Sequence, residues 1–171
     1  AGMPAVAVTD TNNIFGALEF SGAAAKAGVQ PIIGCQLRIV ETADDPGGIM
    51  AFLVKNDEGY RNLLKLLSYA YMQAEDAHDP HVPLSVLTKH ASGLIALSGG
   101  PAGPIGRLLR EEQLEASETW LTQLHQAFGD RLYIEIQRHG LGAEDATEEL
   151  FIELAYKYGI PLVATNDVFF A

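Results

Sequence analysis

The chain has 171 residues, enough for one domain with a substantial core, and 48% of them are hydrophobic, which excludes a disordered protein. Its 11 basic and 22 acidic residues give a net charge of −11, so binding to the phosphates of duplex DNA over a large surface is not expected. The single cysteine excludes an internal disulfide, and no apolar run reaches the roughly 20 residues that a membrane helix needs. These properties predict a cytoplasmic protein without membrane contact.

The first predicted element is a short buried strand that runs into a polar turn. Residues 6–8 form an apolar run without polar alternation, the pattern of a strand covered on both faces. Asp10 follows at the carboxyl end, where parallel α/β folds place ligand and catalytic groups. Thr11 and Asn12 are suited to cap the helix that we predict for residues 13–27.

The middle of the chain departs from strict alternation of strand and helix. Residues 30–40 predict a strand, and the turn chemistry at 44–48 predicts a hairpin between 37–40 and 49–54. A long helix is predicted from Asp57, its expected cap, to Gln73. Its apolar positions recur at three- and four-residue spacing, and they are Tyr60, Leu63, Leu64, Leu67 and Tyr71.

The second half returns to alternation. After a polar loop at 75–83, the predicted elements are a helix at 84–89, a strand at 93–98, an irregular segment at 99–104, a helical region in two pieces within 105–128, a strand at 131–137, a helix at 143–158 and a strand at 161–165. Strands that alternate with helices predict an α/β fold with a barrel or an open parallel sheet.

Three side chains capable of chemistry follow predicted strands: Asp10, His139 and Asp167. If the strands are parallel, these groups converge on one edge, and carboxylates with imidazole suit hydrolytic metals such as Zn²⁺ or Mn²⁺. The alternative is structural. Both aspartates can cap helices or turns, and His139 can be a loop residue bonded to backbone.

Three other features predict no site. His78 and His81, with Asp76 nearby, lie in a polar proline-containing segment that predicts a solvated loop. Cys35 lies in a predicted strand and is expected to be a buried thiol. The glycine-rich segment at 99–103 lacks the lysine and spacing of a phosphate loop.

Taken together, six segments resemble a known family, the PHP (polymerase and histidinol phosphatase) domain at the amino end of bacterial replicative DNA polymerase III alpha subunits. They occur in family order, and they are residues 2–10, Gly34 after 31–33, residues 55–63, 93–99, 133–140 and 164–167. The resemblance implies a distorted (β/α)7-type barrel, of which residues 1–171 would be a single-domain fragment. The first strand and the later part of the barrel would lie outside it, in a much longer polymerase chain.

The resemblance also implies a metal site at the barrel mouth in active members, and Asp10, His139 and Asp167 match its positions. Other ligand positions are changed. Active members carry histidine at Thr11, glutamate at Gln36, cysteine at Gly100 and histidine at Phe169, and a further histidine is replaced near Ile49. Because hydroxyl, amide, glycine and phenyl groups are poor ligands, we expect a vestigial site with no metal or other cofactor in this domain. Magnesium would serve the palm of the parent polymerase, and Zn or Mn would be bound here only if the site were active.

The function implied is therefore that of a degenerate scaffold. Such a domain would brace the palm and thumb of the parent polymerase and dock the proofreading exonuclease subunit, within the polymerase III holoenzyme. Two alternatives remain open: a metal-dependent phosphoesterase acting as a 3′–5′ exonuclease or pyrophosphatase, and the same domain of the error-prone paralogous polymerase.

Overall fold

The structure, a computed structural model, describes residues 2–42, 44–72, 79–166 and 168. The strands are β1 (Ala5–Thr11), β2 (Gln30–Val40), β3 (Gly48–Val54), β4 (Val82–Pro83), β5 (Leu94–Leu97), β6 (Leu132–Ile136) and β7 (Leu162–Ala164). The α-helices are α1 (Ala17–Lys26), α2 (Asp57–Met72), α3 (Leu84–Leu87), α4 (Pro104–Arg110), α5 (Leu114–Phe128) and α6 (Gly142–Tyr158). Short 3₁₀ turns occupy Thr88–His90, Gly100–Ala102 and Gly129–Arg131. None of the described helices is long and apolar enough to cross a membrane.

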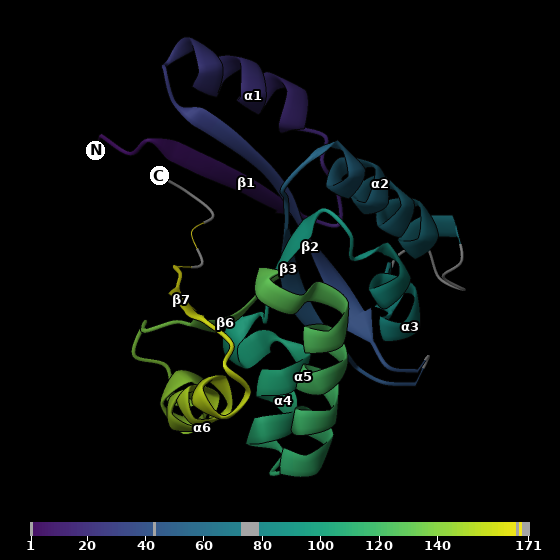
Figure 1. Ribbon diagram of the computed structural model, residues 1–171, viewed down its shortest axis with the longest axis vertical. Helices are drawn as coiled ribbons and strands as arrows, with labels where there is room; N and C mark the ends of the chain where they lie inside the picture. The colour runs from purple at the N-terminus through teal and green to yellow at the C-terminus, as the bar shows by residue number, and fades with distance from the viewer. Residues whose placement is uncertain (1, 43, 73–78, 167, 169–171) are drawn as a thin grey trace.

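The strands form one curled sheet with the order β1-β2-β3-β5-β6-β7, and β4 pairs with the far end of β2 (Figure 1). The pairs β1/β2, β5/β6 and β6/β7 are parallel, whereas β3 runs antiparallel to both β2 and β5. The predicted hairpin between β2 and β3 is therefore confirmed, as is the α/β class with a barrel-like sheet.

The helices cover the outer face of this sheet. Helix α1 packs on β1 and β2, α2 on β3 and β5, α5 on β5 and β6, and α6 on β6 (Figure 1). Alternate strand residues point into this layer and are fully buried, namely Cys35, Leu37, Ile39, Met50, Phe52, Leu94, Ala96, Leu132 and Ile134. The intervening residues face the concave side, and this alternation separates a dry core from an inner surface.

Aromatic side chains from α5 anchor the core. The Phe52 and Phe128 rings stack with centroids 6.1 Å apart, joining β3 to the end of α5. Trp120, which is 1% exposed, donates its indole N–H to Glu41 Oε2 at 3.3 Å. The two-piece helix predicted within residues 105–128 is confirmed as α4 and α5, although Leu114 is 47% exposed rather than part of the core.

One backbone contact sets how closely α2 approaches the sheet. A Cβ atom added at Gly59 would lie 1.9 Å from the carbonyl oxygen of Gly93, so only glycine fits there. Gly93 precedes β5 and has φ +72°, a conformation that glycine adopts without strain. The Asn62 side chain donates to the Ser92 carbonyl at 2.9 Å and holds the same junction.

The start of α1 differs from its prediction. The helix begins at Ala17 rather than at residue 13, because Asn13 folds the preceding turn by accepting the Phe15 N–H at 3.1 Å. Asn12 adopts φ +57° and does not cap the helix. Ile14 packs on the core, whereas Leu18 is 87% exposed.

Two further expectations were wrong. Asn56, rather than Asp57, caps α2 by accepting the Gly59 N–H at 3.0 Å. The predicted polar loop at 75–83 contains β4, whose Val82 is buried. Of that loop, residues 75–78 lie outside the described part of the chain.

Candidate functional site

A hollow of about 550 Å³ opens on the concave face of the sheet. Its lining residues alternate along the strands and their carboxyl ends, and they are Ala7, Thr9, Thr11, Gln36, Ile49, Ala51, Leu53, Leu97, Gly99, Ala102, Glu135, Gln137, Thr165, Asn166 and Val168. Most of the polar members lie at or near the ends of β1, β6 and β7, and Gln36 lies on β2 beside Thr11. Carboxyl ends of parallel strands are where such folds bind ligands, so this hollow is the candidate site.

Glu135 is the one carboxylate among the described residues that line the hollow, and its side chain is held by two elements. Its Oε2 accepts the Gly99 N–H at 3.0 Å, and its Oε1 accepts the hydroxyl of Thr165. Its own N–H donates to Ser98 Oγ at 2.9 Å. The residue is only 7% exposed, so this network ties the ends of β5, β6 and β7 together beneath the rim.

The described residues at the rim formed by β1 and β2 are uncharged. Thr11 Oγ1 lies 3.4 Å from Gln36 Oε1, and β1 and β2 pair directly at these two residues. This side can hydrogen bond to a neutral group, but it offers neither the imidazole nor the carboxylate that a divalent transition metal prefers.

The described residues of the hollow offer few ligands for a transition metal. Glu135 would be a single ligand whose two oxygens are already engaged, and hydroxyl and amide oxygens cannot complete a transition-metal site. Within the described ranges, no three His, Cys, Asp or Glu side chains lie close enough to hold an ion.

Asp10 and His139 do not come together in the hollow. Asp10 lies between Thr9 and Thr11 on β1, and neither it nor His139 is among the residues that line the hollow. A Cβ added at Gly16 would lie 3.5 Å from Asp10 Oδ2, which places the carboxylate toward the start of α1. Asp167 and Phe169 lie outside the described residues, so the vestigial assignment stays a prediction.

His139 is engaged instead with the first turn of α6. Its Nδ1 lies 2.6 Å from Glu144 Oε1, while Glu144 Oε2 accepts the backbone N–H of His139 at 2.6 Å and of Leu141 at 3.0 Å. Burial raises the pKa of Glu144, but the hydrogen bonds from Leu141 and His139 outweigh it, and the net pKa lies below its ordinary value. Glu144 therefore acts as a clamp on the loop after β6.

The remaining candidate positions have structural explanations. Gly100 has φ +53°, and a Cβ there would lie 3.2 Å from Gln137 Oε1, so a side chain at this position would meet the rim. Burial raises the pKa of the Cys35 thiol to about 12, which fits the inert buried thiol that was predicted. His81 Nδ1 contacts the Asp79 carbonyl at 2.9 Å, whereas Asp76 and His78 are outside the described residues.

Sequence reasoning missed Glu135 and Glu144. Period-two alternation along the strand at 131–137 places Glu135 on the face opposite Leu132 and Ile134, which would have identified it as inward-facing. The third helical position of α6, where a carboxylate can reach back to free N–H groups, would have identified Glu144.

Comparison with protein families and curated sequences gives one consistent result. The family model described as PHP domain matches residues 1–139. Among curated relatives, the DNA polymerase III alpha subunit of Caulobacter vibrioides is 42% identical over 177 residues, covering 100% of this chain and 16% of the relative. The subunits of Vibrio cholerae and Thermus aquaticus are 37% and 39% identical, covering 99% and 96% of this chain and 15% and 14% of each relative. The chain thus spans only 14–16% of the length of these relatives.

Solved structures show the same fold at low identity. A protein of Bifidobacterium adolescentis described as a metal-dependent phosphoesterase superposes with a TM-score of 0.56 at 14% identity, covering 97% of this chain and 77% of that protein. An amidohydrolase of Chromobacterium violaceum superposes with a TM-score of 0.55 at 14% identity, covering 96% and 76%. At this identity the likeness concerns the fold alone.

Proposed function

The chain belongs to the PHP domain family, and from that membership we propose that it is a noncatalytic supporting domain of a bacterial DNA polymerase III alpha subunit. The parent chain would carry DNA-directed DNA polymerase activity in a palm that uses Mg²⁺. Identities of 35–42% to alpha subunits over at least 96% of this chain support that parent.

The donor set of the hollow is the observation that supports a scaffold rather than a hydrolase. Thr11 and Gln36 face each other where active members would carry histidine and glutamate, and Gly100 stands where they would carry cysteine. Glu135 is committed to two hydrogen bonds that join neighbouring strands. These groups stabilise the sheet and leave few electron pairs for a cation.

The proposed role is mechanical support and partner docking. A curled sheet covered by helices gives a stiff body against which the palm and thumb of the parent could brace. The net charge of −11 favours protein partners over the DNA backbone, and the proofreading exonuclease subunit is the partner that we propose.

Metal analysis of the full-length parent tests the absence of catalysis. We expect substoichiometric Zn and Mn after supplementation and no hydrolysis of DNA 3′ ends or pyrophosphate that depends on Asp167. The matched control is Asp130→Ala, which removes an exposed carboxylate after α5. Two or three bound ions, with hydrolysis lost in Asp167→Ala and kept in Asp130→Ala, would establish the phosphoesterase alternative.

Binding to the purified exonuclease subunit tests the docking role. We expect the parent to form a stable complex in size-exclusion chromatography, and we expect removal of residues 1–171 to abolish it. A complex that survives this truncation would place the docking surface elsewhere in the polymerase. The error-prone paralogue would be indicated by a parent that extends primers but forms no complex.

A further inference from the structure

Helix α2 carries a second apolar face that points away from the core. Its buried face consists of Gly59, Asn62, Leu63, Leu66, Leu67 and Ala70. On the outside, Tyr60 is 39% exposed, Leu64 40%, Tyr71 45% and Met72 77%. We call residues 60, 64, 68, 71 and 72 the α2 outer stripe. Residues 60, 64 and 68 are four apart, and 71 and 72 follow 68 by three and four residues, the spacing that aligns side chains along a helix.

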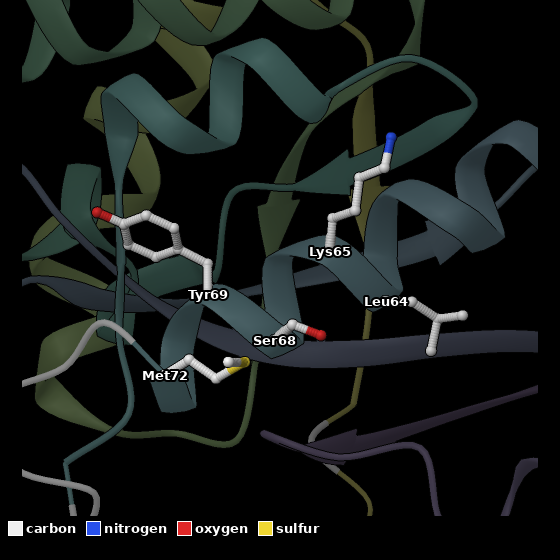
Figure 2. Close-up of a pocket in the computed structure, with 5 residues that line it drawn as sticks. All are labelled: Leu64, Lys65, Ser68, Tyr69 and Met72. Carbon is white, nitrogen blue, oxygen red and sulfur yellow. The ribbon is translucent and has the colours of Figure 1, made fainter.

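The outer stripe borders a hollow of about 350 Å³. Figure 2 shows that Leu64, Ser68 and Met72 follow one another along one side of α2, with Lys65 and Tyr69 on the adjoining side. The small Ser68 lies between two larger apolar side chains, which leaves a recess between two ridges. Such a surface accepts the ridge of another helix.

The end of the stripe is held in place before any partner arrives. The Tyr71 hydroxyl donates to the Asn12 carbonyl at 3.0 Å, which connects α2 to the turn between β1 and α1. An ordered aromatic ring loses little conformational freedom on binding, and such residues are favoured anchors of interfaces.

The charges along α2 indicate the chemistry of the occupant. Its two basic residues, Arg61 and Lys65, are one turn apart beside the stripe, whereas its two acidic residues, Asp57 and Glu58, are confined to the first turn. The whole chain has a net charge of −11, so a cationic border on an apolar stripe is a local exception. It complements an apolar segment flanked by carboxylates.

We propose that the α2 outer stripe binds an amphipathic helix of a separate polypeptide, with an apolar seam flanked by Asp or Glu. The cationic border formed by Arg61 and Lys65 is the observation that favours this occupant. The inference goes beyond the proposed function and does not depend on it.

Two designed peptides test the proposal on the full-length protein. Each has about 16 residues, the length of α2, with leucine at the seam positions. One carries glutamate at the flanking positions and the other carries lysine. In fluorescence anisotropy, we expect the acidic peptide to bind at least tenfold more tightly than the basic one, and we expect added salt to narrow this difference.

Variants of the stripe supply the second readout. Leu64→Glu and Met72→Glu place charges in the seam and should each weaken the acidic peptide at least tenfold, about 1.4 kcal/mol. Lys65→Glu should weaken the acidic peptide and strengthen the basic one. Leu114→Glu, at a leucine of similar exposure on α5, is the matched control and should change neither affinity. Circular dichroism verifies that each variant is folded.

Three results would overturn the proposal. The first is equal binding of both peptides, or binding unaffected by Leu64→Glu. The second is slow maleimide labelling of Leu64→Cys in the full-length protein alone, which would mean that its own chain covers the stripe. The third is a concentration-dependent dimer that Leu64→Glu abolishes, which would make a second copy the occupant.

Discussion

Removing the Glu135 carboxylate should destabilise the domain through two specific donors. In Glu135→Ala, the Gly99 N–H and the Thr165 hydroxyl both lose their acceptor. Gly99 lies in a tight turn with φ +83°, so its N–H cannot readily turn to another partner. The Thr165 hydroxyl faces the hollow and can bond to water instead. Most of the lost stability therefore comes from the unpaired Gly99 N–H.

The expected magnitude follows from these two donors. A hydrogen bond to a charged group contributes about 1.5–3 kcal/mol, and a buried donor left unpaired costs about 1–3 kcal/mol. Because one of the two donors regains water, we expect Glu135→Ala to lower the free energy of unfolding by about 2–4 kcal/mol. For a domain of this size, about 2–4 °C per kcal/mol corresponds to a Tm lower by about 5–15 °C.

Glu135→Gln is the matched variant. Its amide oxygen can still accept from Gly99, and its NH₂ can donate to Thr165 once the hydroxyl turns to accept. We therefore expect a loss of only about 1 kcal/mol. Thermal and urea unfolding, followed by circular dichroism, compare the two variants with the wild-type protein. Equal losses in both variants, or a loss below about 0.5 kcal/mol in Glu135→Ala, would refute the hydrogen-bond explanation.

Three further outcomes follow from the structure. Because the pKa of Glu144 is lowered, its carboxylate stabilises the fold above pH 4.5, and this stabilisation is lost as the pH falls through the lowered pKa. Glu144→Gln should therefore reduce the fall of Tm at acidic pH. An unchanged fall of Tm in this variant would contradict the role of Glu144 in holding the loop after β6. Gly59→Ala should lower the free energy of unfolding by about 1–3 kcal/mol in urea, because its Cβ would collide with the Gly93 carbonyl, whereas Gly22→Ala, within α1 and with no atom in reach, should not destabilise the fold. The Cys35 thiol, with its pKa raised to about 12, should stay unreactive toward a disulfide reagent at pH 8 and react once urea unfolds the chain; rapid native labelling would show that the site opens.

The order and type of the elements could be predicted from local pattern because backbone conformation depends on near neighbours. The hairpin between β2 and β3 required only turn residues between two apolar runs, and the break between α4 and α5 required only an interrupted periodicity. The predicted starts of helices α1 and α2 were wrong because a single side chain determines each of them. The Asn13 side chain accepts a hydrogen bond within the turn before α1, so the helix begins later. The Asn56 side chain, and not that of Asp57, caps α2.

The apolar spacing of α2 does not identify which side of the helix meets the sheet. The spacing of Tyr60, Leu64 and Tyr71 is compatible with the core, yet α2 turns Leu63, Leu66 and Leu67 inward. Periodicity identifies which residues share a side but not which side meets the sheet. The close contact of Gly59 with Gly93 makes that choice, and it joins residues far apart in the chain.

The sequence by itself determined the family and the α/β class, because local patterns and characteristic segments carry both. The replaced ligands at Thr11, Gln36 and Gly100 stay a prediction from residue identity. Only the tertiary structure decided which side chains share the hollow. It set Asp10 apart from Thr9 and Thr11, paired His139 with Glu144, and placed Glu135 between Gly99 and Thr165. The physical reason is that strand register and packing determine which donor lies beside which acceptor. Register and packing are established only when segments distant in the sequence come together.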